Sequence, residues 1–317
     1  MRTIAIVGGT GFIGKQLASV LAKQNWHIRI LSRNSEVKKD LSVLPNVSLL
    51  NVNYSDQNTL NQALNGCDVV ANLVGILNES GRDGSGFRKA HVQLAENLIT
   101  ACQENKIKRL LHISALNADT EKGTSHYLRT KGEAEDIIHA AQGINVTSFR
   151  PSVIFGIDDS FFNRFASLLK LSPVLPLASP NSRFAPIHIG DVVKAMTNSI
   201  DNKKTYGQRY NLCGANVYTL KQLVQMTADM MGIKRIIVGL PQWVGKAQAQ
   251  VFEFVPTKPL SVDNLNSLKV DSVCECNDLI ESFGIEPQTI EAVMPRYFAQ
   301  QSYREQYDTY RSQAKRD

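Results

Sequence analysis

The chain has 317 residues, of which 43% are hydrophobic and 20% are charged, and its formal net charge is +6. These values exclude wholesale disorder and fit either one large α/β domain or a core with a smaller lobe. They also predict that the chain does not span a membrane, because no stretch approaches the roughly 18 apolar residues of a transmembrane helix.

The mild basic excess suits phosphate-bearing ligands or an anionic surface. No Lys/Arg run carries the interleaved aromatics of nucleic-acid binders, so we expect no nucleic-acid partner. Five scattered cysteines suggest no disulfide framework, and Cys274-Glu275-Cys276 lacks the second Cys or His pair of a zinc site, so we expect no metal. The composition therefore favours reduced thiols in a cytoplasmic protein, and peripheral attachment to the inner membrane stays open.

Short apolar runs alternate with amphipathic segments through the first half of the chain. We expect strands at Thr3–Val7, His27–Leu31, Val47–Val52, Asp68–Val74, Arg109–Ser114 and Asn145–Phe149. Helical spacing predicts helices at Ile13–Gln24, Thr59–Asn65, Phe87–Asn105 and Tyr127–Gln142. This alternation predicts an α/β fold with a doubly wound parallel sheet of the Rossmann type.

The alternation stops after Arg150-Pro151. The segment Pro173–Pro186 carries four prolines and is expected to be irregular. A helix is predicted at Asp191–Ser199, and Gln208–Cys213 is expected to be the last strand of the core sheet. From Thr219 onward the pattern is mostly helical, and this includes the tail Ile290–Asp317.

The first predicted strand runs directly into a glycine-rich loop. Gly8 permits a tight turn, Gly11 lets the backbone approach a pyrophosphate, and Gly14 lets the following helix pack closely on the strand. The helix N-terminus offers free N–H groups and a positive dipole end to phosphates. A merely structural turn is the alternative, but the position inside a β-α series favours a dinucleotide site. The candidate cofactor contacts here are Gly8, Thr10, Gly11, Phe12, Ile13 and Gly14.

The end of the second predicted strand bears on which dinucleotide is bound. An acidic residue about 20 positions after the glycine fingerprint would hold the ribose hydroxyls of NAD, and none is present. Arg33 stands there instead and suits a 2′-phosphate, which favours NADP(H) over NAD(H). A solvated surface arginine is the alternative. Asn53 or Tyr54, after the third strand, are candidates to flank the adenine.

Tyr127 and Lys131 lie four residues apart at the start of a predicted helix and so share one helical face. A nearby ammonium is expected to lower the pKa of the Tyr127 phenol. Lys131 can also hold a ribose hydroxyl, while Tyr127 acts as acid or base on a carbinol carbon. The spacing occurs often by chance, but its position directly after the fifth strand favours a catalytic pair.

These residues together resemble the short-chain dehydrogenase/reductases in their extended or atypical branch, over nearly the whole chain. Within that branch the chain is most similar to the NADPH-binding accessory subunit of respiratory complex I and its bacterial relatives, which are NAD-dependent epimerase/dehydratase-like. The stretches that carry the resemblance are Gly8–Gly14, Asn72–Gly75, His112–Ala118, Tyr127–Lys131, Arg150–Phe165 and Phe184–Val192.

The resemblance implies a domain organisation and further site residues. Residues 1–155 and about 186–215 would form the NADP-binding Rossmann domain, and 156–185 and 216–317 would form a smaller, mostly helical substrate or partner lobe. Val74 and Gly75 would line the ribose near the nicotinamide, and Pro151 and Val153 would contact the nicotinamide end. Ser114 would lie at the cofactor edge and is the third candidate catalytic residue.

One position departs from the family pattern. Ala115 stands where such enzymes usually carry the Ser or Thr that orients a substrate carbonyl. Tyr127 and Lys131 favour an NADP(H)-dependent oxidoreductase or epimerase-like enzyme. Ala115 favours the alternative, a non-catalytic NADPH-binding accessory or assembly protein, and an NADPH-sensing regulator is a third hypothesis.

The sequence leaves the substrate open, whether a small molecule or a lipid-like compound. The tail is rich in aromatic and basic residues, from Arg296 to Arg316. It is a candidate for contact with an anionic membrane surface or with a respiratory complex. An amphipathic helix packed on its own domain is the alternative.

Overall fold

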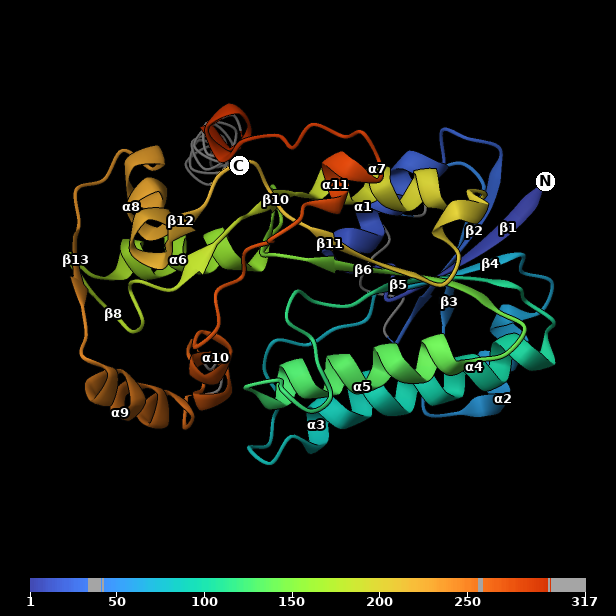
Figure 1. Cartoon of the computed structure of the whole chain (residues 1–317), viewed down its shortest axis with the longest axis horizontal. Coiled ribbons are helices and arrows are strands. Elements are labelled where there is room, and N and C mark those ends of the chain that lie inside the picture. The colour runs from blue at the N-terminus through green and yellow to red at the C-terminus, as the bar shows by residue number, and fades with distance from the viewer. Residues whose placement is uncertain (34–40, 42, 256–258, 296, 298–317) are drawn as a thin grey trace, which may run out of the picture.

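A seven-stranded parallel sheet forms the centre of the molecule, with the strand order β11-β6-β5-β4-β1-β2-β3 (Figure 1). The computed structural model describes residues 1–33, 41, 43–255, 259–295 and 297. The strands are β1 (Arg2–Val7), β2 (Trp26–Ser32), β3 (Val47–Asn51), β4 (Val69–Asn72), β5 (Arg109–Ile113), β6 (Asn145–Pro151) and β11 (Gln208–Leu212). The strand order reverses beside β1, so the predicted doubly wound fold is confirmed.

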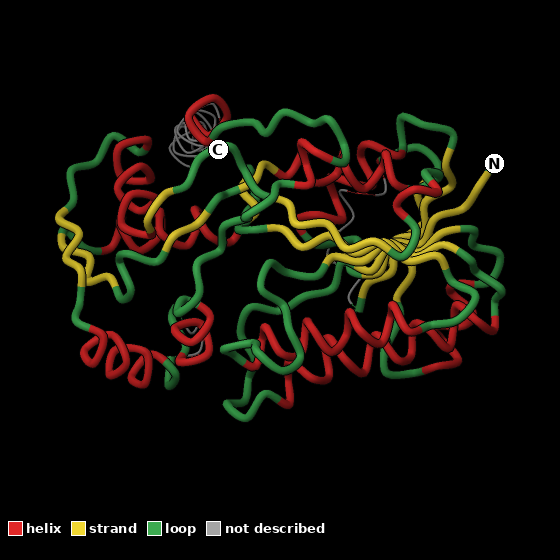
Figure 2. The backbone as a smooth tube through the Cα atoms, viewed as in Figure 1, coloured by secondary structure: helices red, strands yellow, loops and turns green. Residues whose placement is uncertain are grey.

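Helices cover both faces of this sheet, as the two red layers around the yellow strands show (Figure 2). One face carries α1 (Phe12–Leu21), α7 (Ile189–Ser199) and α11 (Asp278–Glu281), and the other carries α2 (Gln57–Leu64), α4 (Leu94–Glu104) and α5 (His126–Ala140). Successive side chains of a strand point to opposite faces, so Ile4 and Ile6 pack in one core cluster while Ala5 and Val7 pack in the other. Burial on both faces explains why these strands are continuously apolar.

The helix expected at Phe87–Asn105 is present but is not uniform. It consists of α3 (Ser85–Arg88), a π-helical stretch (Lys89–Gln93) and α4. Such π-helical turns are uncommon and occur often at functional sites. The π-helical stretch carries His91, which is buried against the start of α5.

Apart from the two clusters on the faces of the sheet, a further cluster lies beyond the sheet, and we call it the second core cluster because it belongs to the second part of the fold. It is formed by side chains from α6 (Ser160–Leu171), α8 (Leu220–Met230) and the short strands beside them. These strands pair as β7 (Ile154–Phe155) with β10 (Ile187–His188), β9 (Arg183–Phe184) with β12 (Tyr218–Thr219), and β8 (Val174–Leu177) with β13 (Ile236–Gly239). The remaining elements are a 3-10 turn (Lys203–Thr205), α9 (Gln242–Phe252) and α10 (Val262–Ser267). None of the described helices is long and apolar enough to cross a membrane.

Two expectations for the second half need correction. The proline-rich segment Pro173–Pro186 is not wholly irregular, because β8 and β9 form within it and take partners from outside it. The region after Thr219 is mostly helical but also contributes β13. Two- and four-residue strands carry too little periodicity to be recognised without their partners. Most of the predicted tail helix, including Arg296 and the residues after Tyr297, lies outside the described residues.

The expectation of reduced cysteines is also wrong in part. Cys213 and Cys274 form a disulfide with a Cα–Cα distance of 6.0 Å. Cys213 directly follows β11, and the loop that carries Cys274 lies against it in a small buried cluster. Cys67, Cys102 and Cys276 are free. A separation of 61 residues leaves no local signal of the pairing, which depends on the path of the chain.

Candidate cofactor and catalytic site at the carboxyl edge of the sheet

The predicted site residues follow the carboxyl ends of neighbouring parallel strands. The glycine loop follows β1, Arg33 follows β2, Val74 and Gly75 follow β4, Ser114 follows β5, and Pro151 ends β6. Parallel strands end at the same edge of a sheet, so these segments meet there. Asn53 lies two residues beyond β3; its side chain is exposed and accepts a hydrogen bond from Ser55 N.

The glycine loop has the geometry that its spacing predicts. Gly8 has a φ of +78°, and a Cβ at Gly14 would lie 2.4 Å from Gly9 Cα, so α1 packs directly on the loop. A Cβ at Gly11 would meet only Gly8 O, at 3.2 Å. Gly11 is the N-cap of α1 and supplies no side-chain cap. The first N–H groups of α1, from Phe12 and Ile13, are therefore available to an anion, and the loop fits a pyrophosphate.

Two side chains brace the loop from the ends of β2 and β3. Tyr54 Oη donates to Leu31 O at 2.7 Å and accepts from Gly8 N at 3.2 Å. Thr10 Oγ1 lies 3.1 Å from Ser32 Oγ. Arg33 is the next residue and is exposed. The loop is thus tied to the strand end at which a dinucleotide would present its adenine ribose.

Lys131 connects α5 to the sheet edge. Its ammonium Nζ donates to Val74 O at 3.0 Å and to Ile113 O at 2.9 Å, and a Cβ at Gly75 would lie 3.2 Å from it. Lys131 is buried, and this burial lowers the pKa of its ammonium to about 8 against the opposing charge of Glu135. The structure thereby brings Lys131, Val74 and Gly75 together at this edge of the sheet.

Tyr127 lies one turn before Lys131 on α5. Its ring packs edge-on against Phe87 and His91, with centroid distances of 6.1 and 5.7 Å. Burial raises the pKa of the Tyr127 phenol to about 12, so the expected lowering by Lys131 is wrong for this structure. The apolar surroundings penalise the phenolate, and the ammonium is engaged by two backbone carbonyls. At neutral pH the phenol therefore carries its proton.

The residues after β5 form the floor beside Tyr127. Ser114 is buried, and its Oγ has no hydrogen-bond partner among the described residues. Ala115 packs with Ala118 and Leu128, and Tyr127 lies against this cluster. A hydroxyl is therefore present one position before the expected one, and the expected position is apolar.

Comparisons with known proteins can be set beside this geometry. The NAD dependent epimerase/dehydratase family matches residues 4–213. The chain belongs to this family. Among its relatives, NADH dehydrogenase (ubiquinone) 1 alpha subcomplex subunit 9 of Arabidopsis thaliana, a mitochondrial protein, is 28% identical over 86% of this chain and 71% of its own length. The 40 kDa subunit of NADH-ubiquinone oxidoreductase of Neurospora crassa is 25% identical, over 96% of this chain and 80% of its own.

A second kind of relative is named as an enzyme. The ceramide reductase of Caulobacter vibrioides is 27% identical over 75% of this chain and 73% of its own length. Among solved structures, a nucleoside-diphosphate-sugar epimerase from Staphylococcus aureus has a TM-score of 0.70 at 21% identity, covering 92% of this chain and 98% of its own. The UDP-glucuronic acid 4-epimerase of Bacillus cereus, solved with UDP-glucuronic acid and NAD, has a TM-score of 0.66 at 18% identity, covering 84% and 99%. These structures show the epimerase fold.

Two residues at the site of this epimerase-family chain, His91 and Asp263, could not be identified from the sequence. His91 Nε2 accepts from Ile76 N at 3.4 Å, so the ring proton lies on Nδ1, which is 2.9 Å from Thr130 Oγ1. Burial lowers the pKa of His91 to about 2, which keeps the ring neutral. His91 therefore fixes the strand-end segment at Ile76 against α5. The π-helical stretch that positions it has no recognisable sequence signal.

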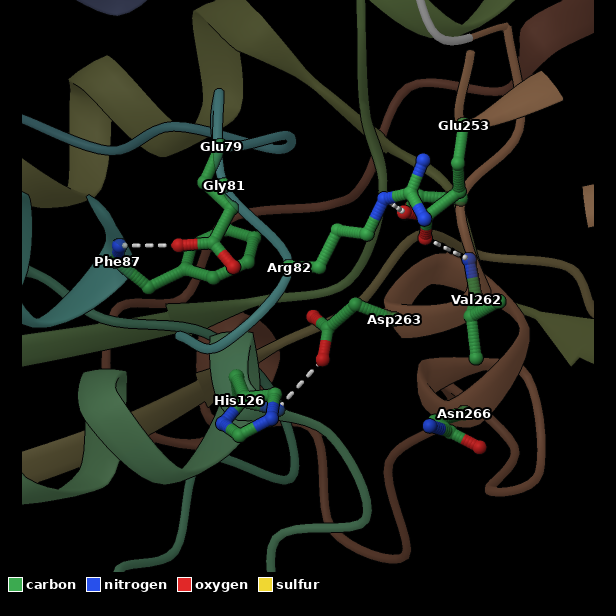
Figure 3. A pocket seen from close by; sticks show the side chains of 10 residues that line it. Glu79, Gly81, Arg82, Phe87, His126, Glu253, Val262, Asp263 and Asn266 are labelled. Atoms are coloured by element: carbon green, nitrogen blue, oxygen red, sulfur yellow. Dashed lines mark hydrogen bonds and ion pairs between the residues drawn. The ribbon is translucent and has the colours of Figure 1, made fainter. Parts of the chain in front are cut away.

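The other is Asp263, from α10. Its carboxylate accepts from His126 N at 2.6 Å and from Tyr127 N at 3.1 Å, the first N–H groups of α5 (Figure 3). Beside it lies a cavity of about 100 Å³, whose lining includes Glu79, Phe87 and His126 together with the ion pair of Arg82 and Glu253. An aspartate 137 residues from its partner gives no signal in the sequence.

Polar side chains beyond the sheet are engaged within the protein. Arg183 forms an ion pair with Asp271 at 2.8 Å, and Arg164 Nη1 donates to Pro259 O at 3.5 Å. His188 lies against the Phe155 ring, and its Nε2 is 3.2 Å from Tyr297 Oη. These side chains tie segments of the second lobe to one another.

Proposed function

We propose that this chain is an NADP(H)-preferring reductase or epimerase-like enzyme that uses Tyr127 as its proton donor. The observation that carries the proposal is the pair of hydrogen bonds that Lys131 Nζ donates to Val74 O and Ile113 O. It ties the tyrosine helix to the strand ends beside the glycine loop. Each of these three segments was a separate prediction from sequence.

The dinucleotide would lie across the carboxyl ends of β1, β2 and β4. Gly11 and the N-terminus of α1 would receive its pyrophosphate, and Arg33 would pair with a 2′-phosphate. Thr10, Asn53, Pro151 and Val153 remain proposed contacts. The exposed Arg33, which directly follows β2 at the position where an acidic residue would hold the ribose hydroxyls of NAD, supports NADP(H) over NAD(H).

The bound nicotinamide supplies or accepts the hydride. Tyr127 would donate its phenolic proton to the carbonyl oxygen of the substrate, since its raised pKa keeps that proton in place at neutral pH. Lys131 would donate to a ribose hydroxyl from the position it already holds beside Gly75. The unpartnered hydroxyl of Ser114 would orient the substrate carbonyl in place of the missing Ser or Thr at position 115.

The cofactor preference is tested by titrating the purified, cofactor-free chain with NADPH and with NADH and following cofactor fluorescence. We expect tighter binding of NADPH, and we expect Arg33→Ala to weaken NADPH by about tenfold or more while leaving NADH nearly unchanged. Arg2→Ala, which removes an exposed arginine that pairs with Asp201, is the matched control. Equal affinities for both dinucleotides would overturn the preference, and binding of neither would overturn the proposed function.

A second candidate function is a non-catalytic NADPH-binding subunit or assembly protein of a respiratory complex. The apolar setting of Ala115 favours it, as do the complex I names of two relatives. Tyr127→Phe distinguishes the two. An enzyme retains NADPH affinity but loses at least about a hundredfold in NADPH consumption with quinone, acyl-thioester or nucleotide-sugar substrates. A structural subunit shows no such consumption in either form.

A further inference from the structure

Helix α9 is oriented against the usual rule for a surface helix. Trp243, Ala247 and Val251 recur every four residues on its exposed side, and the side chains of Trp243 and Val251 are 76% and 64% exposed. Its buried residues are Gly245 and Ala249, and a Cβ at Gly245 would lie 2.9 Å from Ala178 Cβ. A surface helix normally turns its large apolar residues inward. Here the fully buried residues are Gly245 and Ala249, Val244 and Phe252 are half-buried, and Trp243 and Val251 face solvent.

The neighbouring two-stranded sheet repeats this inversion. β8 and β13 are parallel, with Val174 opposite Ile236 and Pro176 opposite Val238. All four side chains are exposed, and Ile236 is 64% exposed. The alternate residues Leu175, Leu177 and Ile237 point into the second core cluster. We call Val174, Pro176, Ile236 and Val238, together with Trp243, Ala247 and Val251, the distal patch.

The elements of the distal patch gather at one end of the molecule. Figure 1 shows β8, β13 and α9 at the end of the long axis opposite the N-terminus. Gln248 Nε2 donates to Pro176 O at 3.4 Å, which joins α9 to β8. Leu171, which ends α6 shortly before β8, is 83% exposed. Apolar side chains thus protrude from the tip of an elongated molecule.

The chain segments that carry the distal patch are basic. Residues 168–180 and 233–251 contain Lys170, Lys234, Arg235 and Lys246 and no Asp or Glu, and Glu253, which follows them, is paired with Arg82. Two copies of this surface would bring cations against cations, which disfavours self-association. Protruding Trp and aliphatic side chains bordered by Lys and Arg are the composition that enters the interface of an anionic bilayer.

We propose that the distal patch is a membrane-docking surface that inserts into the interface of anionic phospholipid bilayers. Trp243, Val251 and the outward face of β8 and β13 would enter the headgroup–acyl boundary. Lys234 and Lys246 would meet the lipid phosphates. The main sheet would remain in water, since Figure 1 shows it on the side of the molecule that carries the N-terminus, while β8, β13 and α9 form the other end. The proposal does not depend on the proposed function.

The chain's two tryptophans allow a direct test, because Trp26 is only 7% exposed while Trp243 faces solvent. The full chain is mixed with phosphatidylcholine vesicles, with or without phosphatidylglycerol. We expect a blue shift of tryptophan fluorescence with the anionic vesicles only, reversed by salt. The shift should persist in Trp26→Phe. No shift with either vesicle would overturn the proposal.

Vesicle co-sedimentation then maps the surface. We expect Trp243→Ala to weaken partition by about tenfold, and Lys234→Gln and Lys246→Gln by about fivefold each. Ile280→Ser, which removes an exposed apolar side chain on α11, should bind as the wild type does. Equal binding of Trp243→Ala and wild type overturns the proposal. Two other outcomes would also overturn the proposal. One is a concentration-dependent dimer, seen by analytical ultracentrifugation without lipid, that dissociates in Trp243→Ala. The other is an acidic protein that occupies the distal patch in preference to vesicles. NADPH titration of Trp243→Ala reports separately on the cofactor site.

Discussion

At the scale of single residues, two neighbouring positions after β5 differ in chemistry. Ser114 is buried, and its Oγ has no partner among the described residues, whereas Ala115 has no hydroxyl and packs against Ala118 and Leu128 beside Tyr127. A hydrogen bond made only in the transition state is worth about 2.7–4 kcal/mol at comparable sites. The substrate-orienting role proposed for Ser114 therefore rests on one hydroxyl.

The first prediction concerns this hydroxyl. We expect Ala115→Ser to raise the rate of NADPH consumption by about tenfold to a hundredfold, because it restores the donor that the family usually carries. Ser114→Ala should lower the rate by a similar factor. Ala118→Ser, in the same apolar cluster, is the control and should leave the rate unchanged. A chain whose rate is zero in all four forms would favour the non-catalytic candidate.

The second prediction concerns buried histidines. Burial lowers the pKa of His91 from 6.5 to about 2 and that of His139 to about 4. Each ring takes up a proton below pH 6.5 only when the chain unfolds. The free energy of unfolding therefore keeps its full value above pH 6.5 and falls as the pH is lowered below it. From pH 6.5 to about pH 5 the free energy of unfolding should fall by about 2 kcal/mol for His91, and by a smaller amount for His139, whose ring is only partly buried and is screened by solvent.

Urea unfolding at the two pH values measures this fall. His91→Gln should reduce the pH dependence by the share of one ring, although it lowers stability at both pH values. His27→Gln, on β2 and outside the buried set, should not change the difference. A pH dependence that is identical in His91→Gln and wild type would contradict the assignment.

At the scale of elements, helix α5 depends on two caps from different parts of the chain. Ser125 Oγ accepts from Leu128 N at 3.1 Å, and Asp263 accepts from His126 N and Tyr127 N. The carboxylate also lies at the positive end of the helix dipole. The second lobe therefore holds the helix that carries Tyr127 and Lys131 in register with the sheet.

The third prediction follows from this contact. Asp263→Ala should lower the free energy of unfolding by about 1–2 kcal/mol, as loss of a helix cap does. It should also raise the NADPH concentration needed for half-saturation, since Lys131 would be less well positioned. Asp158→Ala, which changes an exposed aspartate before α6, is the control. An Asp263→Ala chain with wild-type stability and affinity would show that the contact is incidental.

At the scale of the whole molecule, one covalent bond and several polar contacts join the end of the main sheet to the C-terminal half. The disulfide from Cys213 to Cys274 lies beside Ser152 Oγ, which donates to Ser272 O at 2.6 Å. Leu279 and Ile285 lie within residues 216–317, the stretch expected to form the second lobe, but pack in the core cluster on the α1 face of the sheet. The two parts are therefore interlocked.

The fourth prediction concerns the disulfide. Closing a loop of 61 residues restricts the unfolded chain, so Cys213→Ser should lower the free energy of unfolding by roughly 4 kcal/mol. A dithiol reductant should have a similar effect on the wild-type chain and none on the variant. Cys276→Ser is the control and should match wild type. Unfolding of the wild-type chain that is insensitive to reductant would contradict the bond.

Features that depend on residues close together in the chain could be predicted from the sequence alone. Apolar runs and helical spacing predicted the seven strands and main helices of the Rossmann core, because burial on both sheet faces leaves a continuous apolar pattern. The spacing of Gly8, Gly11 and Gly14 predicted the loop at the N-terminus of α1. Tyr127 and Lys131 could be paired because residues four apart share a helical face.

Contacts between segments that are distant in the chain could not be predicted from the sequence and are known only from the folded structure. The two carbonyls that hold Lys131, the carboxylate of Asp263 on α5, the pairing of β8 with β13 and the bond from Cys213 to Cys274 all join residues far apart in the chain. The raised pKa of Tyr127 belongs with them, since it reflects burial by side chains from other elements. Local sequence patterns indicate the secondary structure that each segment favours. Which polar groups become buried against one another depends on how the whole chain packs.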